Sequence, residues 1–342
     1  MTAPEQRTDL LSGPFPGPHL ALAPSPVIAG YSALPKALAR PVIAIGNFDG
    51  VHRGHQAVIR TAHELARSLG RPAVVLTFEP HPRVFFAPTQ PMVRITPAPL
   101  KAAVIQAFGA DGVIEFAFDA PFASLTATQF IDDLLVSRYG ASGVVVGHDF
   151  HFGKGREGSP AFLRERAREH HLPVEIVEPV ADGQTPVSSS AIREALSVGD
   201  IATANHLLGY RWIVQSEVIH GDARGRTLGY PTANMRLDSE NCLRHGIYAV
   251  RARIDGIIRD GVASFGRRPT FDDGAALFEV HLFDFSGDLY GKRPAIEFLA
   301  WLRPEMKFDN IDALITQMHQ DSADARAIAA RPRAQNGISL LG

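Results

Sequence analysis

The chain has 342 residues, of which 45% are hydrophobic and 20% charged, and its formal net charge is -2. This length predicts about two domains, and the balanced charge gives no electrostatic reason to expect nucleic acid or an anionic membrane as a partner. The single cysteine, Cys242, excludes an intrachain disulfide and any cysteine-built metal site. Because a single cysteine suits a reducing compartment, we expect a cytoplasmic protein, and no apolar run approaches the roughly 20 residues of a membrane span.

The two ends of the chain differ from the rest in composition. Residues 1–26 are rich in Pro, Ala and Gly and lack the basic n-region of a signal peptide, so they predict a disordered leader. Residues 333–342 predict a similar loose tail.

Residues 27–190 alternate short β-rich runs with helical stretches, which predicts a doubly wound parallel sheet covered on both faces. In such an α/β domain, ligands bind beyond the carboxyl ends of the strands. Residues 191–209 read as linker helices. The expected strands are 42–45, 73–78, 112–116, 143–147 and 174–178, and the expected helices lie near 55–69, 98–108, 126–139 and 160–171.

Residues 210–332 have the pattern of an antiparallel β domain. The stretch "YAVRARIDGIIRDGVASFG" alternates apolar and polar residues around a turn at Asp255-Gly256, a strong hairpin signal. "FEVHLFDF" and "PAIEFLAWL" are further expected strands. A final helix, capped by Asp309 or Asn310, would close a small β-barrel. Its expected apolar face holds Ile311, Leu314, Ile315 and Met318.

The stretch "VIAIGNFDGVHRGHQAVI", residues 42–59, places glycines and two histidines where a strand ends and a helix begins. Gly46, Gly50 and Gly54 let the backbone turn sharply and approach a ligand closely, and the helix N-terminus offers free N–H groups to an anion. His52 and His55 can donate hydrogen bonds to phosphoryl oxygens there. The alternative is that one histidine caps the helix and the other is solvated.

The motif "GNFDGVHRGH" resembles the G-x-F-D-x-x-H-x-G-H element of the nucleotidyltransferase superfamily. The later motifs "TFEPHP", "VGHDFHFG", "VSSSAIREAL", "GYPTAN", "FGRRPT", "EVHLFDF" and "WLRPEMKF" follow in order. Together they resemble the bifunctional riboflavin kinase/FAD synthetase family over about residues 40 to 330. The resemblance implies a nucleotidyltransferase domain followed by a riboflavin kinase barrel.

In the first domain, the resemblance implies that His52, His55 and Arg193 act in adenylyl transfer to FMN. Two simpler alternatives concern the helix start "SSSAIR": Ser189 or Ser190 caps the helix, and Arg193 pairs with Glu194 or with solvent. Where relatives more often carry Arg, this chain has His151. The residues expected to bind nucleotide or phosphate are Gly46, Asn47, Phe48, Asp49, Gly50, Gly54, Asp149, Ser188 and Ser189.

In the second domain, Glu279 is the implied base, on a strand face shared with His281, Phe283 and Phe285 that we expect to be largely buried. Thr232 and Asn234 are the implied oxygen ligands of a nucleotide-bound magnesium ion. The alternatives are that "GYPTAN" is an ordinary turn and that Glu279 is an exposed edge-strand acid, a description that fits Asp284 better. The residues expected to bind nucleotide are Gly225, Gly229, Pro231 and Thr232.

The implied function is ATP-dependent phosphorylation of riboflavin to FMN, then adenylylation of FMN by a second ATP to give FAD and pyrophosphate. Magnesium would enter with ATP, and apo-flavoproteins are conceivable acceptors of the products. The alternatives are a flavin-binding regulatory or storage protein without turnover and a cytidylyltransferase, which would not explain the barrel motifs. The sequence predicts no oligomeric state. Two further departures from the family are Ser264 and "LLGYRW" at 207–212.

Overall fold

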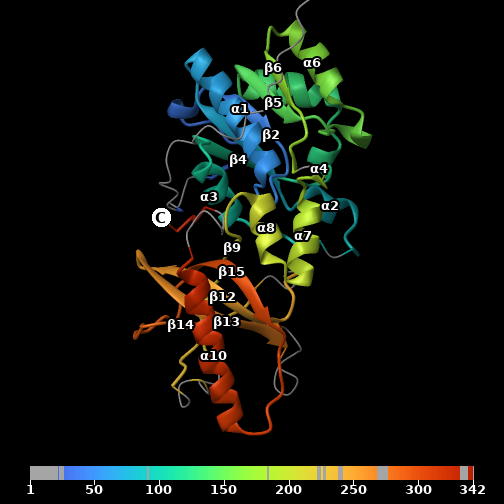
Figure 1. Ribbon diagram of the computed structural model, residues 1–342. Helices are drawn as coiled ribbons and strands as arrows, with labels where there is room; N and C mark the ends of the chain where they lie inside the picture. The colour runs from blue at the N-terminus through green and yellow to red at the C-terminus, as the bar shows by residue number, and fades with distance from the viewer. Residues whose placement is uncertain are drawn as a thin grey trace, which may run out of the picture.

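The computed structural model describes residues 22, 27–90, 92–182, 185–221, 225, 229–237, 242–267, 276–331 and 338–341. Two sheets follow one another along the molecule, with helices α7 (Ser189–Val198) and α8 (Ile201–Leu208) at the level where they meet (Figure 1). The expected leader, residues 1–26, lies outside the described residues except for Leu22, which packs against the core.

The first sheet has six parallel strands in the order β1-β4-β3-β2-β5-β6. The chain moves outward from β2 through β3 to β4 and then continues on the other side of β2 with β5 and β6, so the order reverses between β2 and β5. The expected strands are confirmed, and the edge strand β1 is an addition. The strands are β1 (Val27–Ala29), β2 (Val42–Ile45), β3 (Ala73–Glu79), β4 (Gly112–Ala117), β5 (Gly143–Gly147) and β6 (Val174–Val177).

Helices cover both faces of this sheet, which confirms the doubly wound architecture. The alternate strand residues Val42 and Ala44 pack with α1 and α3, whereas Ile43 and Ile45 pack with η2 and α6. The helix expected near 126–139 is α5 continued by a π-helical segment, and two short helices, α2 and α4, are additions. The helical elements are η1 (Lys36–Leu38), α1 (Arg53–Leu69), α2 (Pro82–Phe86), α3 (Leu100–Ala107), α4 (Ala120–Ala123), α5 (Ala127–Gln129), η2 (Phe130–Arg138), η3 (Lys154–Arg156) and α6 (Pro160–Glu169).

The second sheet has seven antiparallel strands in the order β10-β11-β14-β13-β12-β15-β9. Its two edge strands, β9 and β10, are consecutive in sequence, so the short connection 216–217 holds the edges of the curled sheet together as a barrel requires. Asp255 and Gly256 both have positive φ, as a two-residue type I′ turn demands. The strands are β9 (Ile213–Gln215), β10 (Val218–Ile219), β11 (Ala233–Met235), β12 (Gly246–Ile254), β13 (Ile257–Arg267), β14 (Ala276–Leu282) and β15 (Ala295–Arg303). A separate small hairpin pairs β7 (Ala181–Asp182) with β8 (Thr185–Pro186).

The terminal helix α10 (Ile311–Ala329) lies across the barrel (Figure 1). Asn310, rather than Asp309, caps it by accepting a hydrogen bond from Ala313 N at 2.8 Å. Burial is deepest at Asp321 and Ala325. The expected apolar face is therefore confirmed only in part: Ile311 is 62% exposed, and Leu314, Ile315 and Met318 are half-buried.

One hydrophobic core runs through both halves of the molecule. Helices α7 (Ser189–Val198) and α8 (Ile201–Leu208) contribute to it, as do Tyr210 and Trp212 at the start of the second half. The end of the expected loose tail also joins this core. Leu340 and Leu341 are buried, and Arg211 N donates to Ile338 O at 2.9 Å. The prediction of a loose tail is therefore wrong for residues 338–341, because two leucines there bury their side chains.

Candidate functional sites

The glycine-rich loop between β2 and α1 has its carbonyl groups held by side chains from around it. Thr77 Oγ1 donates to Asn47 O at 3.0 Å, Ser189 Oγ to Asp49 O at 2.8 Å, and Tyr210 OH to Gly50 O at 2.8 Å. Gln56 Nε2 donates to Val51 O at 2.8 Å.

The opposite edge of the same backbone carries free donors. The N–H groups of residues 47–50 donate no hydrogen bond to any other described residue. Three residues of the loop, Phe48, Gly50 and Val51, have positive φ, so the backbone departs from an ordinary strand-to-helix turn. Successive N–H groups in such conformations form an anion-binding concavity, here next to the N-terminus of α1.

His52 and His55 stack on each other at the start of α1, with ring centroids 3.7 Å apart. His52 Nδ1 accepts a hydrogen bond from His55 N at 3.3 Å, so His52 caps the helix, as one half of the alternative held. The other half is wrong, since Nδ1 of His55 is buried and has no partner among the described residues.

Both histidines are neutral at pH 7. Burial, with a smaller contribution from the Arg193 charge, lowers the pKa of His52 to about 4. Burial also holds the pKa of His55 well below its usual value, aided by His52 and Lys101. Because His52 Nδ1 is an acceptor, its proton lies on Nε2, where it can be donated to a phosphoryl oxygen.

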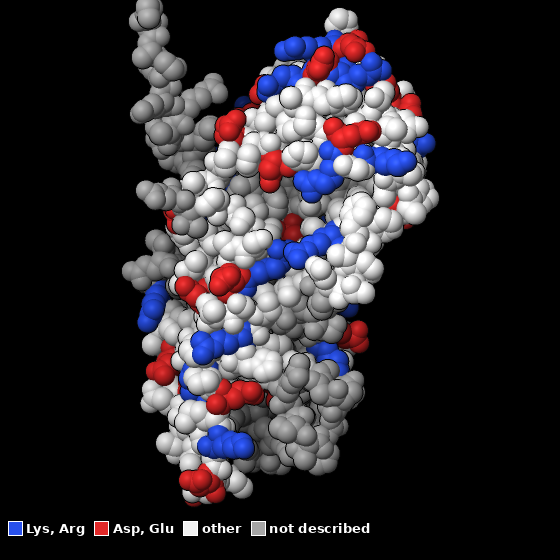
Figure 2. All heavy atoms as spheres, turned by 90° about the vertical axis from the view of Figure 1, so that its right-hand side faces the viewer, with Lys and Arg blue, Asp and Glu red and all other residues white. Residues whose placement is uncertain are grey.

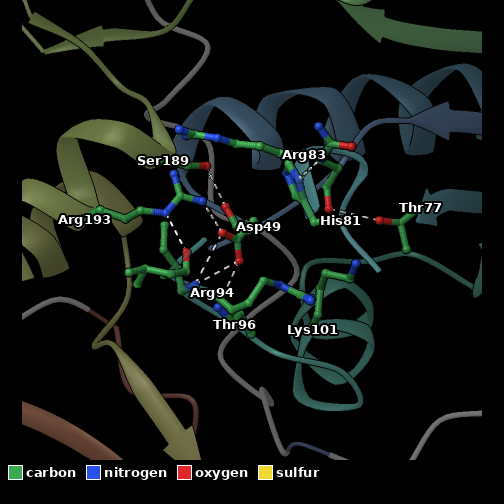
Figure 3. A network of polar contacts seen from close by, with 12 residues as sticks. Asp49, Thr77, His81, Arg83, Arg94, Thr96, Lys101, Ser189 and Arg193 are labelled. Carbon is green, nitrogen blue, oxygen red and sulfur yellow. Dashed lines mark hydrogen bonds and ion pairs between the residues drawn. The ribbon is translucent and has the colours of Figure 1, made fainter. Parts of the chain in front are cut away.

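Asp49 is a buried carboxylate at the centre of a polar network (Figure 3). It accepts hydrogen bonds from Ile95 N at 3.0 Å and Thr96 N at 3.1 Å, and it pairs with Arg193 at 2.6 Å. The carboxylate therefore fixes segment 93–96 against the glycine-rich loop. Because these partners occupy the carboxylate, the backbone N–H is the group of Asp49 that is available to contact a phosphate.

Helix α7 presents Ser189 and Arg193 to this loop (Figure 3). Ser188 caps the helix by accepting from Ala191 N at 3.2 Å, so the alternative of a cap at Ser189 or Ser190 is wrong. Arg193 pairs with Asp49 instead of Glu194, and its Nε donates to Val93 O at 2.7 Å. With 19% of its side chain exposed, Arg193 still reaches the surface of the site.

The motif "VGHDFHFG" begins at the end of β5, the strand beside β2. The loops after β2 and β5 therefore flank the point where the strand order reverses, which is where open α/β sheets bind ligands. Asp149 is exposed there. Phe152 is buried and stacks with Phe150. His151 is also exposed, and its Nδ1 lies 2.9 Å from Asp149 O.

Four charged or titratable residues at this site were not singled out as site residues, although Glu79 and His81 lie in the motif "TFEPHP", which the family resemblance implies to lie beside the flavin. Lys101 is 1% exposed and lies 2.6 Å from Glu79, which also pairs with Arg94. His81 has its pKa lowered to about 4, mainly by burial. The available signal was a lysine inside the apolar run "LKAAVIQAF", because a lysine on a buried helix face needs a partner. The prolines of "TFEPHP" predict a rigid loop, but the first three residues of the motif end β3 and its last residue begins α2.

The second candidate site lies on three neighbouring strands of the barrel. In the strand register, Glu279 of β14 stands directly opposite Asn234 of β11 and Ser264 of β13. Side chains paired in this way have Cβ atoms about 5 Å apart. The predicted base and a predicted magnesium ligand are therefore neighbours, and the departure at Ser264 lies beside them.

The "GYPTAN" segment leads into β11 through Gly229, whose φ is +79. Asn234 is 5% exposed, and its Oδ1 is buried with no partner among the described residues. Pro231 O lies 2.9 Å from His281 Nδ1, and Tyr230 O packs so closely on Gly225 that a Cβ there would lie 2.2 Å away. The segment is more than an ordinary turn, because it buries an oxygen that needs a partner.

The face that carries Glu279 is less buried than expected. Glu279, His281 and Phe285 are half-buried, and only Phe283 is fully buried. On the opposite face of β14, Phe278, Val280 and Leu282 are all buried, whereas Leu277 is the buried β14 residue on the face of Glu279. Asp284 is exposed and paired with Arg326 at 3.0 Å, in agreement with its expected surface role.

Comparisons with known proteins match both halves of the chain. The FAD synthetase family model matches residues 34–191, and the riboflavin kinase family model matches residues 208–329. A bifunctional riboflavin kinase/FMN adenylyltransferase from Pseudomonas fluorescens is 42% identical, over 84% of this chain and 93% of its own length. The protein of that name from Listeria monocytogenes is 39% identical, over 85% of this chain and 93% of its own.

A solved structure has the same architecture over most of the chain. The crystal structure described as a macrolide-efflux protein from Streptococcus pneumoniae superposes with a TM-score of 0.76 at 34% identity, covering 84% of this chain and 94% of that one. In the part of this chain that the structure describes, no helix is long and apolar enough to cross a membrane.

The two sites thus lie on an α/β nucleotide-binding domain and on a small barrel joined to it. The chain belongs to the family of bifunctional riboflavin kinase/FMN adenylyltransferases, with its FAD synthetase and riboflavin kinase domains in that order.

The face seen in Figure 2 mixes basic and acidic side chains and is hollowed near mid-height.

Proposed function

We propose that the two activities of the family take place at the two sites described above. Residues 27–190 would transfer AMP from ATP to FMN, giving FAD and pyrophosphate, and residues 210–332 would phosphorylate riboflavin with ATP, giving FMN and ADP. Residues 191–209 would link the two. The observation that carries the first assignment is the glycine-rich loop, with its carbonyls held by the protein and its N–H groups free, at the reversal point of the sheet.

Adenylyl transfer needs alignment and stabilisation of charge more than a base, because the attacking FMN phosphate is already anionic. The loop N–H groups, the N-terminus of α1 and His52 Nε2 would donate hydrogen bonds to the phosphates of ATP. His55 Nδ1, which is buried and has no partner among the described residues, would likewise donate a hydrogen bond to a phosphate oxygen. Arg193, held by Asp49, supplies a positive charge from α7.

Riboflavin phosphorylation needs a group that accepts the proton of the attacking hydroxyl. Glu279 supports this role because its carboxylate is half-buried beside Asn234 and lies on a rigid central strand. It would accept the proton of the ribityl 5′-hydroxyl as the oxygen attacks the γ-phosphorus of ATP.

The residues near Glu279 fit a magnesium ion that enters with ATP. The buried Oδ1 of Asn234, without a partner among the described residues, is an oxygen of the type that magnesium prefers. Thr232, two residues earlier, would add a hydroxyl oxygen. When bound, the ion would neutralise charge on the transferred phosphoryl group.

Chromatography of products formed from riboflavin, ATP and magnesium tests both assignments. The wild type should form FMN and then FAD. His55→Ala should lower FAD formation about a hundredfold or more and still form FMN. Glu279→Gln should stop FMN formation and still convert added FMN to FAD.

Failure of both activities in either variant would refute the two-site assignment. Binding of riboflavin without any nucleotide product in the wild type would favour the alternative of a flavin storage or regulatory protein, which has no support from the comparisons.

A further inference from the structure

The first residues after the linker helices reach back into the adenylyl-transfer site. Tyr210 is fully buried, and its OH donates to Gly50 O at 2.8 Å. Trp212 is 3% exposed, and its indole Nε1 donates to Ile95 O at 2.9 Å. Both acceptors belong to the first half of the chain, more than a hundred residues away in sequence.

Ile95 is where these contacts meet the site. Its N–H donates to the carboxylate of Asp49, and its carbonyl accepts from Trp212. A Cβ at Gly50 would lie 3.2 Å from its side chain, so Ile95 also packs against the glycine-rich loop. Trp212 therefore fixes the carbonyl of Ile95, while the N–H of the same residue fixes the Asp49 carboxylate. Asp49 in turn holds the guanidinium of Arg193.

Tyr210 acts on the loop itself. Of the side chains that hold the loop carbonyls, Thr77 comes from β3, Ser189 from α7 and Gln56 from α1. Tyr210 alone among these four comes from residues that belong to the riboflavin kinase match. Without its donor, Gly50 O would lose the bond that turns it inward, and the N–H groups beside it would no longer be fixed toward the phosphates.

We propose that Tyr210 and Trp212 are positioning residues of the adenylyl-transfer site, supplied by the start of the kinase module. The departure "GYRW" is thus part of the FAD-forming machinery of this chain. FMN adenylylation depends on the kinase module being joined and folded, whereas riboflavin phosphorylation uses neither hydrogen bond. The inference rests on the proposed location of adenylyl transfer at residues 46–55.

The Arg211 side chain supports this arrangement from between the two aromatic residues. It pairs with Glu297 of β15 at 3.3 Å, and both side chains are almost completely buried. Glu297 also accepts from Leu340 N and from Ser339 Oγ. The backbone of residues 210–212 is therefore fixed to the barrel, which gives the two donors a rigid base.

The test uses conservative variants in the full chain. Tyr210→Phe removes only the hydroxyl, and Trp212→Phe removes the indole N–H but keeps an aromatic ring against Phe298. Each lost hydrogen bond should lower the kcat of FMN adenylylation about fivefold. The KM for ATP should change less, because the contacts orient groups that act on the transition state. Riboflavin phosphorylation should stay within about twofold of wild type.

A matched variant controls for the loss of a buried aromatic hydroxyl. Tyr230→Phe removes a hydroxyl that lies 2.8 Å from His319 Nδ1 within the second domain. This variant should not lower kcat for adenylylation. The proposal is overturned if Tyr210→Phe and Trp212→Phe keep full adenylylation, or if both activities fall together with the melting temperature. His55→Ala is assayed in parallel to test the location of the site itself. If His55→Ala keeps full adenylylation, the proposed site is wrong; if it loses adenylylation while Tyr210→Phe and Trp212→Phe keep it, only the positioning role is wrong.

Discussion

Lowering the pH should destabilise the fold through the buried histidines of the glycine-rich loop. An unfolded histidine titrates near pH 6.5, whereas burial lowers the pKa of His52 to about 4 in the folded state. Between these values the unfolded chain binds a proton that the folded chain rejects. The free energy of unfolding therefore falls as the pH drops from about 7 toward 4.

The size of this effect follows from the two pKa values. For His52 alone, linkage gives a loss of about 2 kcal/mol between pH 7 and pH 5, rising to about 3 kcal/mol near pH 4. No large discount for solvent screening applies, because His52 is only 7% exposed. His55 shifts in the same direction, so the whole protein should lose more than the contribution of His52.

Denaturant unfolding of wild type and His52→Asn at pH 7 and pH 5 measures this contribution. Asparagine keeps a helix-capping oxygen but has no titrating ring, so the variant should lose about 2 kcal/mol less than wild type between the two pH values. His171→Asn is the control, since His171 is exposed and has a positive φ that asparagine tolerates. Equal pH dependence in wild type and His52→Asn would show that His52 is not held neutral by burial.

Three further changes test other parts of the structure. Asn234→Ala should raise the magnesium concentration needed for riboflavin phosphorylation at least about tenfold and leave FMN adenylylation unchanged, as magnesium titrations of both activities would show. Asp49→Asn leaves Arg193 without its partner and should cost about 3 kcal/mol of stability and most FAD formation, measured by denaturation and FMN turnover. Leu340→Ala should cost about 2 to 5 kcal/mol, whereas Ile338→Ala, at a 46% exposed position, should stay within about 0.5 kcal/mol of wild type.

The parallel sheet and the barrel were predictable because their strands repeat a simple local signal. Runs such as "VIAI" and "GVVVG" are apolar at every position, as strands buried on both faces require, and Asp255-Gly256 specifies its turn by itself. The end of the tail was not predictable. The two leucines in "ISLLG" form no periodic pattern, and their burial depends on a surface assembled from Tyr210 and residues of β15.

The candidate sites show the same limit. His52, His55 and the glycines stand in one short stretch, so their joint purpose can be read from spacing alone. The partner of Arg193 could not be read in this way, because Asp49 lies 144 residues earlier in the chain. The sequence offered Glu194 as the nearest acid, but adjacent residues on a helix do not face each other.

The contacts of Tyr210 and Trp212 give a physical reason for the two activities to share one chain. These two hydrogen bonds could not be predicted from the sequence, because their acceptors are the backbone carbonyls of Gly50 and Ile95, and every residue has a backbone carbonyl. Yet they join the loop that would bind phosphate to a strand of the kinase barrel through one continuous core. Separate enzymes would have to replace these donors from within the first domain. We therefore expect the start of the second domain to contribute to the geometry of the first site, although the second domain catalyses the first of the two reactions.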